Sequence, residues 1–271
     1  MDRSISSTDE EKRGKLLTLA AVIALAMFVS KIAQVQVQVI AWRVYLNASI
    51  YFVITLLGLL WAFNFKVKKK STIFLFQSAF YVFSQALFVE FFFFQRFSRI
   101  YEVFILLLIM FLVFIGNYVS FLMANVLNVD LFKKIPLAQV GRTSSYFISL
   151  LMMYFFTFSF LVTGLEIYFL IPLVLLSYIF IVPVHYFNIG VGGEDLYKKS
   201  LLTILISFIL FLGMFLTGDA HEIIAAIPLL GYYFSVGVVS QEELTAVKSK
   251  GIYFYITILV VAFLAGVFLN I

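Results

Sequence analysis

The chain contains no cysteine and only two histidines. The absence of cysteine excludes disulfide bonds, thiolate nucleophiles and cysteine-based metal sites, but it leaves the redox compartment open. Charged residues are also scarce, at 12% of the chain, whereas a typical soluble domain has about 25%. Because 63% of the residues are hydrophobic, the composition predicts an integral membrane protein.

Motifs for known chemistry are missing as well. The sequence contains no HExxH zinc motif, no GxSxG nucleophile motif and no pair of aspartate-rich motifs. Gly190, Gly192 and Gly193 resemble part of a phosphate-binding loop, but Glu194 and Asp195 follow where that loop needs Lys-Ser/Thr. Those acids instead suit the first turn of a helix, whose dipole they complement. We therefore assign no catalytic residue, no cofactor and no metal site, and the pattern favours a non-enzyme.

Long hydrophobic runs fill almost the whole sequence. About 20 apolar residues are enough for one helical crossing of a bilayer, and these runs are too long and too evenly apolar for barrel strands. The predicted fold is an all-α integral membrane protein with nine transmembrane helices. They cover residues 16–34, 46–65, 73–94, 101–125, 136–163, 165–184, 200–217, 223–239 and 252–270. Residues 1–15 are predicted to be a mobile cytoplasmic tail, and residues 16–271 a single polytopic transmembrane domain.

The distribution of lysine and arginine orients these helices. With the N-terminus in the cytoplasm, all 19 of these residues except Lys31, Arg43, Arg96 and Arg99 fall in cytoplasmic segments. Cytoplasmic segments of membrane proteins carry such an excess. The pattern predicts an N-in, C-out multi-pass protein of a plasma (cytoplasmic) membrane. Lys31 lies close enough to the outer end of its helix to extend its ammonium group toward water.

An internal repeat is one interpretation of the spacing of these segments. An offset of 129 residues places Arg13 on Arg142 and Glu90 on Asp219. It would pair the first four helices with the next four as a 4+4 parallel repeat, leaving the ninth helix as an addition. The alternative is that spans of similar length, separated by short loops, coincide at this offset by chance.

Polar side chains on three predicted helices indicate an inward-facing surface. Gln77 and Ser84 share one face of the third helix with Gln85 beside them, Asn117 lies on the fourth, and Ser149 on the fifth. Polar groups are costly to expose to lipid, so they usually face protein or water. These five residues could line a cavity, or they could serve only the packing of helices.

Glu90 is the candidate gate of that cavity. It lies near the outer end of the third helix, where four phenylalanines follow it. A cationic partner such as Arg96 or Arg99 would keep its carboxylate ionised. The alternative is a carboxylate that simply reaches the outer lipid headgroups.

A polar segment between the fourth and fifth helices supplies a candidate anion site. It carries Lys133 and Lys134, and Pro136 can begin the fifth helix, with Arg142 inside it. The planar guanidinium of Arg142 could hold a lipid phosphate through two hydrogen bonds, or it could only mark the inner face. The expected partner is membrane lipid with anionic headgroups at the inner face. No nucleic acid is expected, and nothing in the sequence specifies a protein partner.

These features predict a small carrier of small molecules or lipids, or another lipid-handling protein. A non-catalytic membrane subunit or scaffold is one alternative, because the polar side chains could all be used in packing. A membrane enzyme acting on a lipid-linked phosphate is the other, with Arg142, Lys133 and Lys134 as its anion site. The residues alone identify no family.

Overall fold

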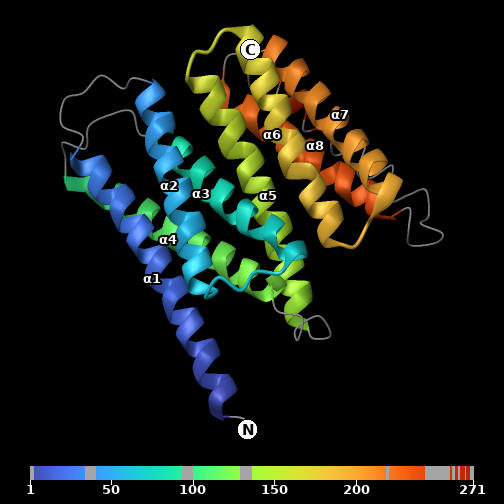
Figure 1. Ribbon diagram of the computed structural model, residues 1–271. Coiled ribbons are helices and arrows are strands. Elements are labelled where there is room, and N and C mark those ends of the chain that lie inside the picture. The colour runs from blue at the N-terminus through green and yellow to red at the C-terminus, as the bar shows by residue number, and fades with distance from the viewer. Residues whose placement is uncertain are drawn as a thin grey trace. The chain divides into compact units, whose positions relative to one another are not determined.

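Figure 1 shows the computed structural model of the protein, in which every described element is helical. The structure describes residues 3–33, 41–92, 100–128, 136–217 and 220–241, together with residues 257, 260, 261, 263–265, 267 and 268. Eight of the described helices are long and apolar enough to cross a membrane. The predicted all-helical architecture is thus confirmed, and the eight long apolar helices are those expected of a multi-pass membrane protein.

The helices lie close to the predicted spans. In chain order they are α1 (Arg3–Ala33), α2 (Ala41–Ala62), the short 3-10 helix η1 (Lys69–Ser71), α3 (Thr72–Phe92), α4 (Ile100–Asn128), α5 (Pro136–Val162), α6 (Ile167–Asn188), α7 (Gly193–Thr217) and α8 (His221–Gln241). Most of the predicted ninth helix, at residues 252–270, lies outside the described residues. The orientation in the membrane and the 129-residue repeat stay predictions.

The helix α1 extends into the segment that was predicted to be a mobile tail. Glu11 and Lys15 form an ion pair of 2.7 Å one turn apart, and such pairs stabilise a helix that has no packing partner. Lys15 also donates a hydrogen bond of 3.2 Å to the side-chain oxygen of Asn64, just after α2. The charged residues of this segment therefore extend α1 beyond its apolar part.

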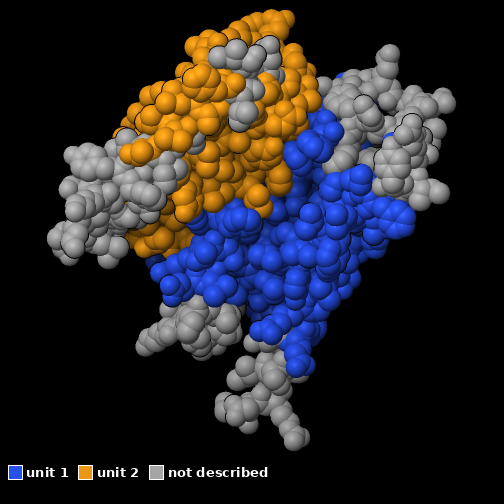
Figure 2. Space-filling model, turned by 180° about the vertical axis from the view of Figure 1, so that it is seen from behind, with its two compact units in different colours: residues 1–148 blue, residues 149–271 orange. Residues whose placement is uncertain are grey.

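The chain divides into two compact units, residues 1–148 and residues 149–271 (Figure 2). In unit 1, α1 and α3 each pack against both α2 and α4, so that the four helices form a closed ring. The helix α3 is more enclosed than α2, because 67% of its membrane-span window is buried, compared with 22% for that of α2. In unit 2, α7 packs against α6 and α8. The buried polar side chains of unit 1 are accordingly concentrated on α3.

In unit 2, two fully buried tyrosines on α6 connect this helix to its neighbours through their hydroxyl groups. The hydroxyl of Tyr178 lies 3.0 Å from that of Thr157 on α5, and the hydroxyl of Tyr186 lies 2.7 Å from that of Thr203 on α7. Thr157 also donates a hydrogen bond of 2.7 Å to the carbonyl of Met153. Each tyrosine therefore fills space between helices while its polar end has a partner, as a buried hydroxyl requires.

Candidate functional site

A buried ion pair connects α1 to α3 in unit 1. The ammonium of Lys31 lies 2.9 Å from the carboxylate of Glu90, and it also donates a hydrogen bond of 3.3 Å to the carbonyl of Glu90. Lys31 is 8% exposed and Glu90 is 6% exposed. Tyr51 on α2 forms a hydrogen bond with Ser30, the residue before Lys31. Three helices thus meet around two opposite charges placed inside apolar spans, where such charges are rare and commonly functional.

The ion pair with Glu90 shows that the predicted role of Lys31 is wrong. We expected its ammonium to reach water, but Lys31 is buried and paired. The expected partners of Glu90, Arg96 and Arg99, lie outside the described residues. Both helices end near the pair, α1 at Ala33 and α3 at Phe92. A lysine in the last turn of α1 also lies where the helix dipole favours positive charge.

One part of the polar face of α3 is fully used in packing. Gln77 donates a hydrogen bond of 2.9 Å to the carbonyl of Ser145 on α5, and the hydroxyl of Ser145 donates one of 2.9 Å back to the side-chain oxygen of Gln77. The hydroxyl of Ser120 on α4 donates to that of Ser78 at 2.9 Å, and Ser78 donates to the carbonyl of Ser120. These four residues hold α3, α4 and the start of α5 together.

Further along α3, some buried polar side-chain atoms have no hydrogen-bond partner among the described residues. Gln85 donates a hydrogen bond of 3.0 Å to the hydroxyl of Tyr81, but its side-chain oxygen has no hydrogen-bond partner among the described residues. Asn117 on α4 is 0% exposed, and neither its oxygen nor its nitrogen has a partner in the described part of the chain. A buried polar atom without a partner costs about 1–3 kcal/mol. Gln85 on α3 and Asn117 on α4 therefore have hydrogen-bonding capacity that the described residues do not use.

Gly116 lets these side chains approach the backbone of α4. A Cβ atom added at Gly116 would lie 2.5 Å from the hydroxyl oxygen of Tyr81 and 3.2 Å from the side-chain nitrogen of Gln85. The side chain of Gln85 therefore lies against α4 at Gly116, the residue before Asn117. We define the polar site as Tyr81, Gln85 and Asn117.

Replacing Gly116 by alanine should test this close approach. Tyr81 is buried and cannot move away freely, so Gly116→Ala should destabilise the protein by about 1–3 kcal/mol through overpacking. Gly14→Ala is the control, because a Cβ at Gly14 on α1 has open space around it and alanine favours a helix more than glycine does. Thermal unfolding in detergent compares the two variants with the wild type. A Gly116→Ala variant as stable as the wild type would show that Tyr81 does not lie against α4.

The remaining predicted site residues have different positions. The hydroxyl of Ser84 is buried and donates a hydrogen bond of 2.8 Å to the carbonyl of Tyr81, within α3. Ser149 is buried on α5, one turn beyond Ser145. Arg142 is exposed near the start of α5, whereas Lys133 and Lys134 lie outside the described residues. The anion site assigned to these three cations stays a prediction.

An apolar groove of about 370 Å³ lies between α1 and α4, on unit 1. Ala21, Ala24 and Phe28 on α1 and Met110, Phe111 and Phe114 on α4 are among the residues that line it. The small side chains of α1 make room between the aromatic rings. No feature of the sequence predicted this groove, because it depends on which faces of α1 and α4 meet.

Comparison with known proteins assigns no relative. No protein-family model matches the chain, and neither a curated protein nor a solved structure matches it. The function is therefore argued from the geometry of the buried polar groups.

Proposed function

We propose that this multi-pass membrane protein is a carrier of small, polar, uncharged solutes. The observation that supports the proposal is the pair of buried amides, Gln85 and Asn117. The side-chain oxygen of Gln85 and both polar side-chain atoms of Asn117 lack hydrogen-bond partners among the described residues. If these side chains served packing alone, they would be expected to bond across helices as Gln77 and Ser145 do. A solute that bonds to them would remove the cost of their burial.

The chemistry of the polar site limits the class of solute. Asn117 offers both a donor and an acceptor, and the free oxygen of Gln85 is an acceptor. Hydroxyl and carboxamide groups of a solute can match this set. An isolated charge fits less well, because Tyr81, Gln85 and Asn117 supply no opposite charge to offset its desolvation.

The ion pair of Lys31 and Glu90 is the proposed gate. Glu90 follows Gln85 by five residues on α3, which is a rise of about 7.5 Å along a helix. The pair therefore lies between the polar site and the end of α3. Separation of Lys31 from Glu90 would free the end of α1 from that of α3, and re-pairing would close the path again.

A second candidate function is lipid handling, and the groove between α1 and α4 favours it. Its aromatic and aliphatic lining suits an acyl chain. In this case the substrate would contact α1 and α4 from the lipid phase, and Gln85 and Asn117 would bond to its headgroup or serve another role.

The natural absence of cysteine allows a direct test of the carrier proposal. A cysteine introduced by Asn117→Cys should react with a membrane-impermeant, cationic methanethiosulfonate reagent in reconstituted vesicles. The reaction requires a thiolate in contact with water, so labelling reports an aqueous path to the polar site. In addition, Lys31→Met/Glu90→Gln should accelerate the labelling if the ion pair is the gate.

Two further single-cysteine variants are the controls for this experiment. Ala79→Cys lies on α3 at 0% exposure, and Leu112→Cys lies on the exposed surface of α4, which would face lipid. Neither should react. If Asn117→Cys is as unreactive as these two in both gate backgrounds, the polar side chains serve packing and the protein is better explained as a scaffold.

A further inference from the structure

The connection between α2 and α3, residues 63–71, is a strongly basic loop. Lys66, Lys68, Lys69 and Lys70 are all exposed, and residues 63–71 contain no acidic residue. The loop follows directly on the apolar helix α2 and precedes α3. When these two helices span a bilayer, the loop lies at the level of the lipid headgroups.

The backbone of this basic loop is held in place by the end of α4. The side-chain amide of Asn128 donates a hydrogen bond of 3.1 Å to the carbonyl of Lys66 and accepts one of 3.1 Å from the N–H of Lys68. The hydroxyl of Ser71 donates a hydrogen bond of 3.0 Å to the carbonyl of Leu127. The lysines therefore start from a fixed backbone, which lowers the entropy lost when they bind a partner.

The end of α2 turns an aromatic side chain outward beside these lysines. Asn64 and Phe65 have positive φ angles of 51° and 57°, and the N–H of Phe65 bonds to the carbonyl of Leu60 as in a helix-ending Schellman motif. Asparagine tolerates this conformation, but a bulky residue such as phenylalanine rarely adopts it. Phe65 is nevertheless 72% exposed. The burial of its ring therefore does not explain why it adopts this strained conformation.

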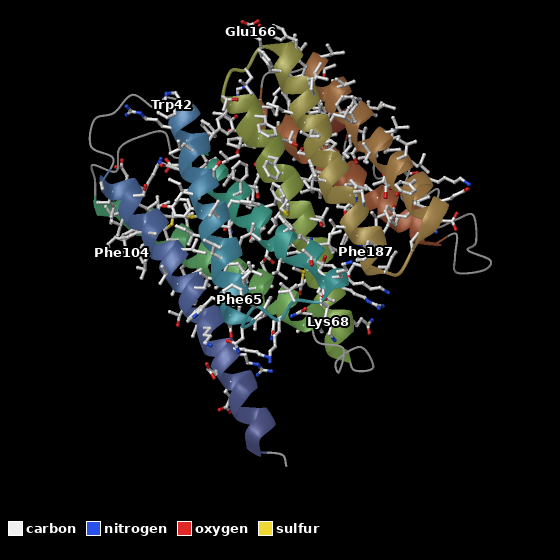
Figure 3. All side chains as sticks on the ribbon, viewed as in Figure 1. Trp42, Phe65, Lys68, Phe104, Glu166 and Phe187 are labelled. Atoms are coloured by element: carbon white, nitrogen blue, oxygen red, sulfur yellow. The ribbon has the colours of Figure 1, made fainter. Side chains whose placement is uncertain are left out.

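We propose that the basic loop binds the headgroups of anionic phospholipids, with Phe65 inserted at their acyl boundary. Figure 3 shows Phe65 and Lys68 on this loop, at the end of α2 opposite Trp42. The phosphate groups neutralise lysines that have no acidic neighbours in the loop. An exposed aromatic ring beside cations suits the interface, where one end of a contact is apolar and the other is wet. This role is independent of the carrier proposal.

The experiment measures phospholipid retained by the purified full-length protein in mixed micelles of phosphatidylglycerol and phosphatidylcholine, by native mass spectrometry. The wild type should retain phosphatidylglycerol in preference to phosphatidylcholine. Each interfacial lysine is worth about fivefold in affinity, so Lys69→Gln/Lys70→Gln should weaken phosphatidylglycerol binding roughly 20- to 30-fold. Raising the salt concentration should weaken the binding of the wild type, because these charges are exposed.

The matched control removes the same charge elsewhere. Lys198 forms an ion pair of 3.2 Å with Glu194 on α7, so its charge is already partly offset. Lys198→Gln/Lys199→Gln should therefore weaken phosphatidylglycerol binding far less than Lys69→Gln/Lys70→Gln does. Asn128→Ala keeps every lysine but loses both bonds to the loop, and it should give an intermediate loss. If Asn128→Ala retains as much phosphatidylglycerol as the wild type, the fixed backbone of the loop plays no role in binding.

Three outcomes would overturn the lipid assignment itself. Equal losses in the two double-lysine variants would mean that only net charge matters. Equal retention of phosphatidylcholine would mean that the headgroup charge is not recognised. Full displacement of phosphatidylglycerol by inorganic phosphate, at matched ionic strength, would indicate a site for a soluble anion.

Discussion

Lys31→Met should destabilise the protein by about 3–5 kcal/mol, the usual effect of removing one partner from a buried ion pair. The substitution keeps the length of the side chain but leaves the carboxylate of Glu90, which is 6% exposed, without the ammonium group 2.9 Å away. The loss should appear as a lower melting temperature in detergent. It should also exceed the effect of Lys198→Met, which removes a lysine from an exposed ion pair of α7, because exposed pairs contribute at most about 1 kcal/mol.

The double variant Lys31→Met/Glu90→Gln separates the effect of the pair from the effect of an uncompensated charge. Replacing both partners also removes the carboxylate that lost its ammonium neighbour, so most of the stability lost in Lys31→Met should return. If the double variant is as unstable as the single one, the contribution of Lys31 comes from packing rather than from its charge. If Lys31→Met melts with the wild type, the ion pair is not buried in the folded protein.

Tyr178→Ala should have an effect of similar size in unit 2. Tyr178 is completely buried, and truncation of a large buried side chain typically costs about 3–5 kcal/mol through lost contacts and the cavity left behind. The affected contacts lie between α6 and α5, where the tyrosine hydroxyl meets Thr157. Unfolding in increasing denaturant, followed by tyrosine and tryptophan fluorescence, would measure the change.

Tyr178→Phe is the matched control for that experiment. It keeps the ring and removes only the hydroxyl, and Thr157 keeps its hydrogen bond to the carbonyl of Met153. The expected loss is therefore about 1 kcal/mol, the net contribution of a single hydrogen bond. Equal losses in the alanine and phenylalanine variants would assign the stability to the hydrogen bond and contradict the packing argument.

The helices were predictable because their signals are local. Pro136 begins α5 as expected, since a proline at the first helical position loses no hydrogen bond. Glu194 and Asp195 occupy the first turn of α7, as the interpretation of the glycine-rich segment required. The extension of α1 toward Arg3 was missed, because hydropathy marks only the part of a helix that is apolar.

The candidate site was only partly predictable, since its contacts depend on how helices pair. Periodicity placed Gln77 and Gln85 on the inward side of α3, but it could not show that Gln77 is satisfied by Ser145 while the oxygen of Gln85 is not. The partner of Glu90 is 59 residues away in sequence. Arg96 was the nearer candidate along the chain. Lys31 is the partner because α1 and α3 belong to the same ring of helices, which a single sequence does not reveal.

The bonds of Asn128 also bear on how this protein can vary in length. One carboxamide joins the carbonyl of Lys66 to the N–H of Lys68, so the two backbone groups must stay two residues apart. Surface connections usually accept insertions and deletions with little penalty. A residue added or removed at Val67 would change this spacing, so the carboxamide could no longer make both bonds at once. The connection between α2 and α3 is therefore a poor place for an inserted tag, although its lysines are exposed to solvent.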